Sequence, residues 1–238
     1  MEPPKPAKAG PREGSPRLRR ILTGAPASLA LLAGVMLIAH GLQTPAPPPQ
    51  PTAAQGFTAA DKATAPSAPP TSSAPVGFAP LAVLAPSTPT RVRIRAIGVD
   101  APLTALSLES DGQLAAPPEA DRNLAGWYRA GTSPGSVGTA IIAGHVDNQQ
   151  GPAVFYGLGA LKKGNTVDVE RADHVDAVFT VDAVEAYAAT DFPERRVYAQ
   201  ATRPELRLIT CGAGFDKKHQ RYLGNVVVFA HMTGNHPG

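Results

Sequence analysis

The uneven spread of proline constrains this chain more than any other feature of its sequence. There are 26 prolines among 238 residues, and they crowd the first third of the chain. Proline lacks a backbone N–H group and fixes φ, so such a segment does not form helix interiors or central strands. The packed domain must therefore lie in the remaining stretch of about 145 residues, which is long enough for a core of its own.

Basic residues gather at the N-terminus and leave the rest of the chain near neutral. The formal net charge is +3. Residues 1–20 contain six basic side chains and two acidic ones: Lys5, Lys8, Arg12, Arg17, Arg19 and Arg20 against Glu2 and Glu13. The charge is a local feature, so we expect no nucleic-acid partner and interpret residues 1–20 as a cytoplasmic basic tail.

Residues 21–42 carry no charge apart from that of His40. A helix of this length spans a hydrocarbon core of about 30 Å. The arginines before it predict a single-pass signal-anchor in the cell membrane, with the N-terminus in the cytoplasm and the chain after residue 43 outside the cell. A cleaved signal peptide is the alternative, because Gly24 and Pro26 shorten the apolar run and Thr44–Ala46 supplies small residues. Pro45 is a poor neighbour for a cleavage point, which favours the retained anchor.

Residues 43–89 are dominated by Pro, Ala, Thr and Ser and lack apolar periodicity. Such a composition cannot offset the entropy of ordering, and proline favours extended polyproline geometry. We predict a disordered, semi-rigid linker that holds the folded domain away from the membrane.

The folded domain is predicted over residues 90–235. Residues 91–97 alternate charged and apolar side chains, which is typical of a strand with one wet face. Five further segments have strand character: 138–144, 166–171, 177–188, 205–211 and 225–232. Helical spacing is confined to residues 153–163. The pattern predicts an all-β domain, either a closed barrel or a sandwich.

Cys211 is the only cysteine, so it cannot form an intramolecular disulfide. It ends the strand segment 205–211 and precedes Gly212-Ala213-Gly214, a position that exposes a side chain at a sheet edge. A buried small hydrophobe is the common alternative for a free cysteine. A nearby imidazole and a fixed positive charge would instead make the thiol a nucleophile.

His145 and Arg221 are the best candidates to activate that thiol. His145 follows the strand segment 138–144 directly, whereas the other five histidines have weaker contexts: His40, His174, His219, His231 and His236. Arg221 lies ten residues after Cys211, a gap that fits a loop returning into the next strand, and its guanidinium suits a developing oxyanion. Taken singly, either residue is more often a structural histidine or a solvated arginine.

Taken together, these segments resemble the sortases, most closely the class F branch of actinobacteria. The resemblance covers residues 90–232, and Leu208-Ile209-Thr210-Cys211 fits the family's Leu-x-Thr-Cys signature. The stretches that carry it are RIRAIGVDAPL, AGWYRAGTSPGSVGTAIIAGHVD, GPAVFYGLGALKKGN, LRLITCGAGFD and RYLGNVVVFA.

The resemblance implies an eight-stranded β-barrel with short helices, behind an N-terminal anchor and linker. It implies that Cys211 attacks the Thr–Gly amide of an LPXTG-like sorting signal and that an amine, such as one of peptidoglycan, resolves the thioacyl enzyme. His145 then serves as the proton-transfer group. Arg221 stabilises the transition state, with Thr210 and nearby backbone N–H groups in support, and Asp147 orients His145. No cofactor or metal is expected.

The chain departs from the family at Ala213, where a second glycine is common. An L,D-transpeptidase is disfavoured because Ile209 and Thr210, not histidine and glycine, precede Cys211. A papain-like hydrolase is disfavoured because its cysteine opens a helix. No aspartate-proline-tryptophan lid motif precedes the domain, which argues against pilin polymerisation. A non-catalytic, membrane-anchored binding module remains the alternative from another functional class.

Overall fold

The structure is a computed structural model that describes residues 46–58 and 83–238. The described residues from 47 onward form one compact unit. The predicted basic tail, the predicted membrane span at residues 21–42 and much of the predicted linker lie outside the described residues. Within the described ranges, the helices are all too short or too polar to cross a bilayer.

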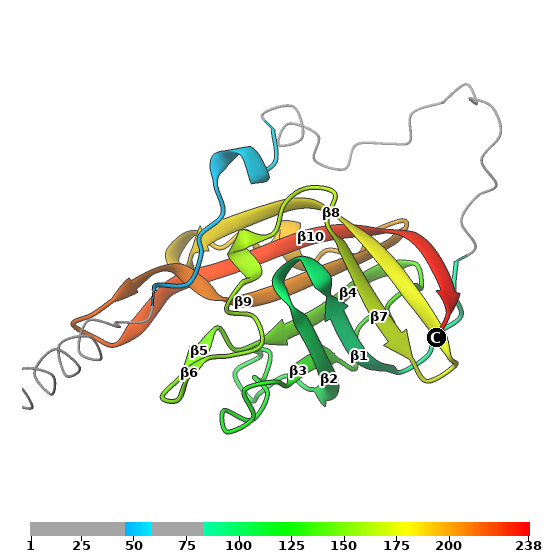
Figure 1. Cartoon of the computed structure of the whole chain (residues 1–238), viewed down its shortest axis with the longest axis horizontal. Coiled ribbons are helices and arrows are strands. Elements are labelled where there is room, and N and C mark those ends of the chain that lie inside the picture. The colour runs from blue at the N-terminus through cyan, green and yellow to red at the C-terminus, as the bar shows by residue number, and fades with distance from the viewer. Residues whose placement is uncertain (1–45, 59–82) are drawn as a thin grey trace, which may run out of the picture. The chain divides into compact units, whose positions relative to one another are not determined.

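Eight strands close into a barrel in the order β1-β2-β3-β4-β9-β10-β8-β7 (Figure 1). Their bounds are β1 Pro89–Ile94, β2 Val99–Leu106, β3 Ala125–Tyr128, β4 Gly138–Gly144, β7 Thr166–Arg171, β8 Val175–Ala188, β9 Pro204–Asp216 and β10 Arg221–Pro237. A separate two-stranded sheet pairs β5 Asp147–Asn148 with β6 Gly151–Pro152. The prediction of an all-β, eight-stranded barrel is confirmed.

Helical structure is confined to short turns in the described ranges. The 3-10 turns are η1 Ala53–Gln55, η2 Arg95–Ile97, η3 Leu158–Ala160 and η4 Ala189–Asp191, and α3 spans Glu194–Tyr198. The predicted helical piece at residues 153–163 contains only η3 and turns. Phe155, Leu158 and Leu161 are all fully buried in the barrel core, which successive turns allow.

The barrel has an interior core and a second apolar layer outside part of its wall. Leu206 and Leu208 of β9 point into the interior, with Phe155 and Phe179 among their neighbours in the core. Their neighbour Ile209 points outward instead, because successive side chains of a strand face opposite sides. The outer layer also contains Val227 and Phe229 of β10, Ile141 of β4 and Val197 of α3. The wall near Cys211 is thus packed on both faces.

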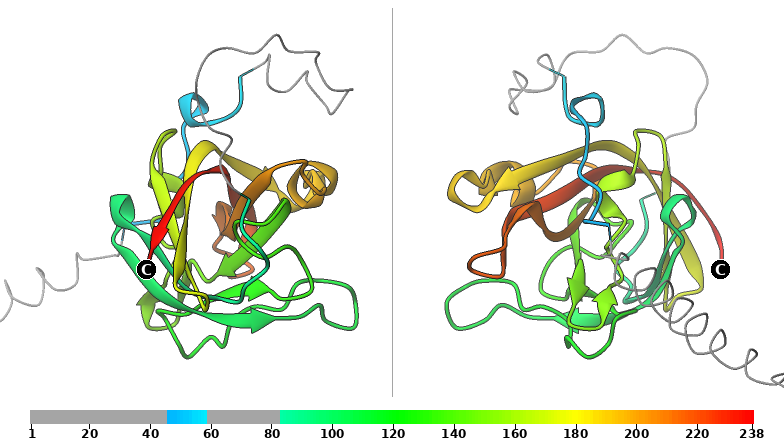
Figure 2. Two further views of the ribbon diagram at one scale, coloured as in Figure 1. Left: turned by 90° about the vertical axis from the view of Figure 1, so that its right-hand side faces the viewer. Right: turned by 60° about the vertical axis from the view of Figure 1, so that its left-hand side comes forward.

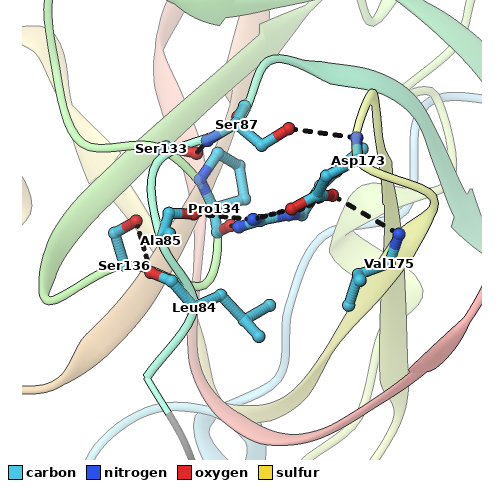
Figure 3. Close-up of polar contacts among 9 residues, drawn as sticks. Leu84, Ala85, Ser87, Ser133, Pro134, Ser136, Asp173 and Val175 are labelled. Atoms are coloured by element: carbon cyan, nitrogen blue, oxygen red, sulfur yellow. Dashed lines mark hydrogen bonds and ion pairs between the residues drawn. The ribbon is translucent and has the colours of Figure 1, made fainter.

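A buried arginine fixes the entry of the chain into the barrel. Figure 3 shows the polar contacts that join residues 84–87 to the loop around Ser133 and to the turn at Asp173. Arg171, buried behind them, donates to the carbonyl of Ala85 at 2.7 Å and pairs with Asp173 at 2.6 Å. That hydrogen bond holds the pKa of Asp173 below its usual range. These contacts fix the segment immediately before β1.

Residues 47–58, which fall within the predicted linker, lie against the barrel (Figure 2, blue). We call this segment the N-terminal strap. The ring of Phe57 packs edge-on against Phe229 of the outer layer, with centroids 4.9 Å apart. This ring packing is one of the contacts that attach part of a proline-rich segment to the barrel.

Candidate active site

The register of β4 and β9 brings His145 to the level of Cys211 along the barrel wall. The two strands are parallel neighbours, with Ala143 opposite Ile209. His145 lies two residues past Ala143, and Cys211 lies two residues past Ile209, so the two reach the same level. Side chains two apart share a face, and adjacent strands lie about 4.8 Å apart. The register therefore brings the backbone at residue 145 to the level of the exposed Cys211.

Gly144 allows the end of β4 to pack closely against residues 154 and 155. A Cβ atom at this position would lie 2.7 Å from Val154 and 2.8 Å from Phe155, which leaves no room for a side chain. The backbone N–H of Phe155 donates to the carbonyl of His145 at 3.0 Å. Phe155 is itself fully buried in the core. The loop that carries His145 is thus anchored to the barrel interior.

Thr210 joins the cysteine strand to the histidine strand. Its side chain is buried, and its hydroxyl donates to the carbonyl of Gly144 at 2.8 Å. The proton therefore points across the ladder and not toward the outer face, where an oxyanion would form. On β10, Asn225 lies directly opposite Cys211 and donates to the Thr210 carbonyl at 3.3 Å.

A backbone carbonyl fixes the imidazole of His145. Its Nε2 atom lies 2.7 Å from the carbonyl oxygen of Pro117, in the loop between β2 and β3. A carbonyl only accepts hydrogen bonds, so Nε2 carries a proton. In the neutral ring Nδ1 is then the atom that accepts a proton. Asp147, which we expected to orient His145, instead accepts a hydrogen bond from the hydroxyl of Tyr222.

A model of the sortase domain matches residues 92–233, more than half of the chain. The chain belongs to the sortase family. No curated protein matches it. Among solved structures it is similar to sortase A of Listeria monocytogenes, with 14% identity over 64% of this chain and 90% of that one and a TM-score of 0.48. A Clostridium perfringens sortase D5 transpeptidase is 17% identical over 62% of this chain and 79% of that one, with a TM-score of 0.45. Sortase C1 of Streptococcus suis is 17% identical over 62% of this chain and 73% of that one, with a TM-score of 0.45.

In this sortase the surroundings of Cys211 disfavour ionisation of its thiol. Partial loss of water around it raises its pKa, and the negative charge of Asp147 raises it further. The pKa of Tyr222 is also raised, first by burial and then by its hydrogen bond to Asp147. Tyr222 therefore stays protonated and keeps the Asp147 carboxylate in place. Formation of the thiolate then requires a proton acceptor.

Arg221 lies at the far end of the hairpin formed by β9 and β10. It is exposed and pairs with Asp216 in the ladder. Four residues separate it from Asn225, the residue opposite Cys211, which is about 13 Å along a strand. Asp216 has a lowered pKa, mainly through its hydrogen bond from His219, with a smaller effect of Arg221. The structure thus brings His145 to the level of Cys211 along the wall and leaves Arg221 beside Asp216.

Three residues of this site were not predicted from the sequence: Pro117, Tyr222 and Asn225. Asn225 had a local signal, because it directly precedes the apolar run 226–230 and Cys211 directly follows the strand segment 206–210. In an antiparallel hairpin, the end of the first strand lies opposite the start of the second. Pro117 and Tyr222 had none, because their partners lie 28 and 75 residues away. In the described ranges, no three His, Cys, Asp or Glu side chains gather as metal ligands would.

Proposed function

We propose that this sortase cleaves an LPXTG-type sorting signal at its Thr–Gly bond through a thioacyl intermediate on Cys211. The observation that supports the proposal is the parallel register of β4 and β9, whose last pair, Ala143 with Ile209, precedes His145 and Cys211 by two residues each. A thiol with a raised pKa is a poor nucleophile alone, so an adjacent proton acceptor is the feature that such chemistry needs.

The first half-reaction forms the thioester. His145 takes the thiol proton as Sγ of Cys211 attacks the threonine carbonyl carbon. The C–S bond forms, the C–N bond to glycine breaks, and the imidazolium gives its proton to the departing amine. The hydrogen bond from His145 to Pro117 leaves Nδ1 as the atom for this exchange.

The second half-reaction transfers the acyl group to an amine acceptor, such as an amine of peptidoglycan. The acceptor nitrogen attacks the thioester carbon and gives its proton to His145. The C–S bond breaks, and the proton returns to sulfur. Both half-reactions pass through an oxyanion that needs hydrogen-bond donors. We assign that role to Arg221, which requires the β9–β10 hairpin to bend toward Cys211 when substrate binds.

The sequence further supports class F membership and a place outside the cell. The apolar run at residues 21–42 follows three arginines, which is typical of a single-pass anchor with a cytoplasmic N-terminus. In this arrangement the barrel meets exported proteins and cell-wall amines on the same side of the membrane.

The test uses the full chain in detergent micelles with an LPXTG peptide and an amine, followed by mass spectrometry. We expect an acyl adduct on Cys211 and an acceptor-dependent product, both lost in Cys211→Ala and strongly reduced in His145→Ala and Arg221→Ala. His231→Ala is the matched control, because His231 is paired with Asp182 at 2.7 Å and lies six residues along β10 from Asn225. A folded protein that forms no adduct with a varied peptide panel would indicate a binding module instead.

A further inference from the structure

The N-terminal strap reaches the irregular part of β9 that follows Cys211. The Oε1 atom of Gln50 accepts a hydrogen bond from the backbone N–H of Ala213 at 3.2 Å. Ala213 is two residues from the nucleophile and 163 residues from Gln50. The strap is therefore connected directly to the segment whose conformation sets the position of the cysteine.

Ala213 has a backbone conformation that needs support. Its φ is +57°, in the left-handed region that alanine disfavours. Gly214 follows with φ +95°, and the register of β9 and β10 shifts between Tyr222 and Gly224. The regular ladder thus breaks just past Cys211, and the hydrogen bond from Ala213 to Gln50 holds the chain where the ladder does not.

The rest of the strap is fastened at points along the barrel wall. Gln55 Oε1 accepts from the N–H of Lys163 at 3.2 Å, and the N–H of Phe57 donates to Glu185 at 2.8 Å. The guanidinium of Arg196 lies over the Phe57 ring, 4.0 Å from its centroid. These contacts fix the path of the strap on both sides of its 3-10 turn.

Gly159 shows how closely the strap is applied. A Cβ atom at Gly159 would lie 2.0 Å from the carbonyl oxygen of Pro49, and its next nearest neighbours also belong to the strap. At Gly157, in the same turn, a Cβ would meet only the side chain of Ile97, at 3.3 Å. Alanine at residue 159 therefore displaces the strap, whereas alanine at residue 157 does not touch it.

We propose that the strap helps to position the nucleophile. Gln50 is a positioning residue, which holds Ala213 and through it the irregular part of β9 after Cys211. The assignment rests on the proposed function only in taking Cys211 as the nucleophile. Gln50 acts here by orienting backbone, and its own atoms need not touch the substrate.

The test follows hydrogen exchange of the Ala213 amide and alkylation of Cys211 by iodoacetamide in the full chain in micelles. We expect Gln50→Ala to speed exchange at Ala213 about fivefold, the effect of losing one hydrogen bond. Gly159→Ala should do the same, with a changed alkylation rate in both variants. Gly157→Ala should match the wild type, and Gln50→Glu, which keeps the acceptor oxygen, should restore slow exchange.

Two outcomes would overturn the proposal. One is wild-type exchange at Ala213 in both Gln50→Ala and Gly159→Ala. The other is faster exchange in these variants with unchanged alkylation of Cys211 and unchanged kcat on a sorting peptide, which would leave the strap a structural attachment only. Exchange and alkylation need no turnover, so a wild-type protein inert toward peptides would contradict the proposed function and leave this test intact.

Discussion

The two halves of the β9–β10 pair differ sharply in environment. In the inner half, residues 206–210 pair with residues 226–230 in regular register, and all of these side chains are buried. In the outer half, residues 213–223 are largely exposed, the register shifts, and Ala213, Gly214 and Gln220 have positive φ. Cys211 lies where one half gives way to the other.

This difference shows how a barrel combines rigidity with access. The inner half fixes the Cα atom of the nucleophile through packing on both faces of the wall. The outer half leaves most of its side chains exposed, where a peptide can reach them. Substitutions in the inner half should therefore change stability first, and substitutions at and beyond the boundary should change reactivity first.

Cys211→Ala gives the largest expected effect on the reactive side. Loss of the nucleophile should reduce transpeptidation by about 10³-fold or more. Because the side chain is exposed, the free energy of unfolding should change by less than about 0.5 kcal/mol. Peptide ligation and urea unfolding measure the two effects, and a large loss of stability would contradict the separation of the two halves.

Leu208→Ala gives the largest expected effect on the packed side. Leu208 is fully buried, three residues from Cys211, and its truncation should destabilise the fold by about 2–5 kcal/mol. In the protein that remains folded, Cys211 should react with iodoacetamide at the wild-type rate. A changed alkylation rate of Cys211 in the folded protein would show that the inner half controls reactivity directly.

Thr210→Val tests the boundary itself. The substitution keeps the shape of the side chain but removes the hydrogen bond to the Gly144 carbonyl, at a cost of about 1 kcal/mol. Because that bond ties the cysteine strand to the histidine strand, kcat should fall while KM stays near the wild-type value. Thr210→Ser keeps the hydroxyl and should retain most of the activity.

Asp147→Asn tests the electrostatics of the exposed side. Asp147 raises the pKa of Cys211, so removal of its charge should lower that pKa and increase the thiolate fraction at neutral pH. The pH profile of iodoacetamide alkylation should shift to lower pH relative to the wild type. A profile that stays in place would mean that partial burial alone sets the reactivity of the thiol.

Ala213→Gly should have the smallest effect. Glycine accepts a φ of +57° without strain but adds freedom to the unfolded chain, so the free energy of unfolding should change by less than about 1 kcal/mol. Hydrogen exchange at residues 212–215 should become faster, because glycine gives this irregular part of β9 more conformational freedom. Exchange as slow as in the wild type would show that the hairpin is as rigid as the inner half.

Strands with simple patterns were predicted well. The predicted bounds 138–144 and 166–171 coincide with β4 and β7. β2 was not predicted because it contains Pro102, a residue that is rare in the middle of a sheet. β3 has only four residues, too few to show a period. The N-terminal strap was not predicted either. Its hydrogen bonds to the amides of Lys163 and Ala213 join residues 108 and 163 apart in the chain, which no local sequence pattern indicates.

By itself, the sequence predicted that His145 follows a strand, as it does after β4, and that the chain has the elements of a sortase barrel. The prediction that the strand ends at Cys211 was wrong, because the ladder of β9 and β10 continues to Asp216. Only the tertiary structure decided that β4 and β9 are parallel neighbours with Ala143 opposite Ile209. It also decided that Arg221 lies beside Asp216 and that Tyr222 holds Asp147. Such pairings join residues far apart in the chain, and a slip of one residue would turn a side chain to the opposite face, so they depend on how the whole barrel closes.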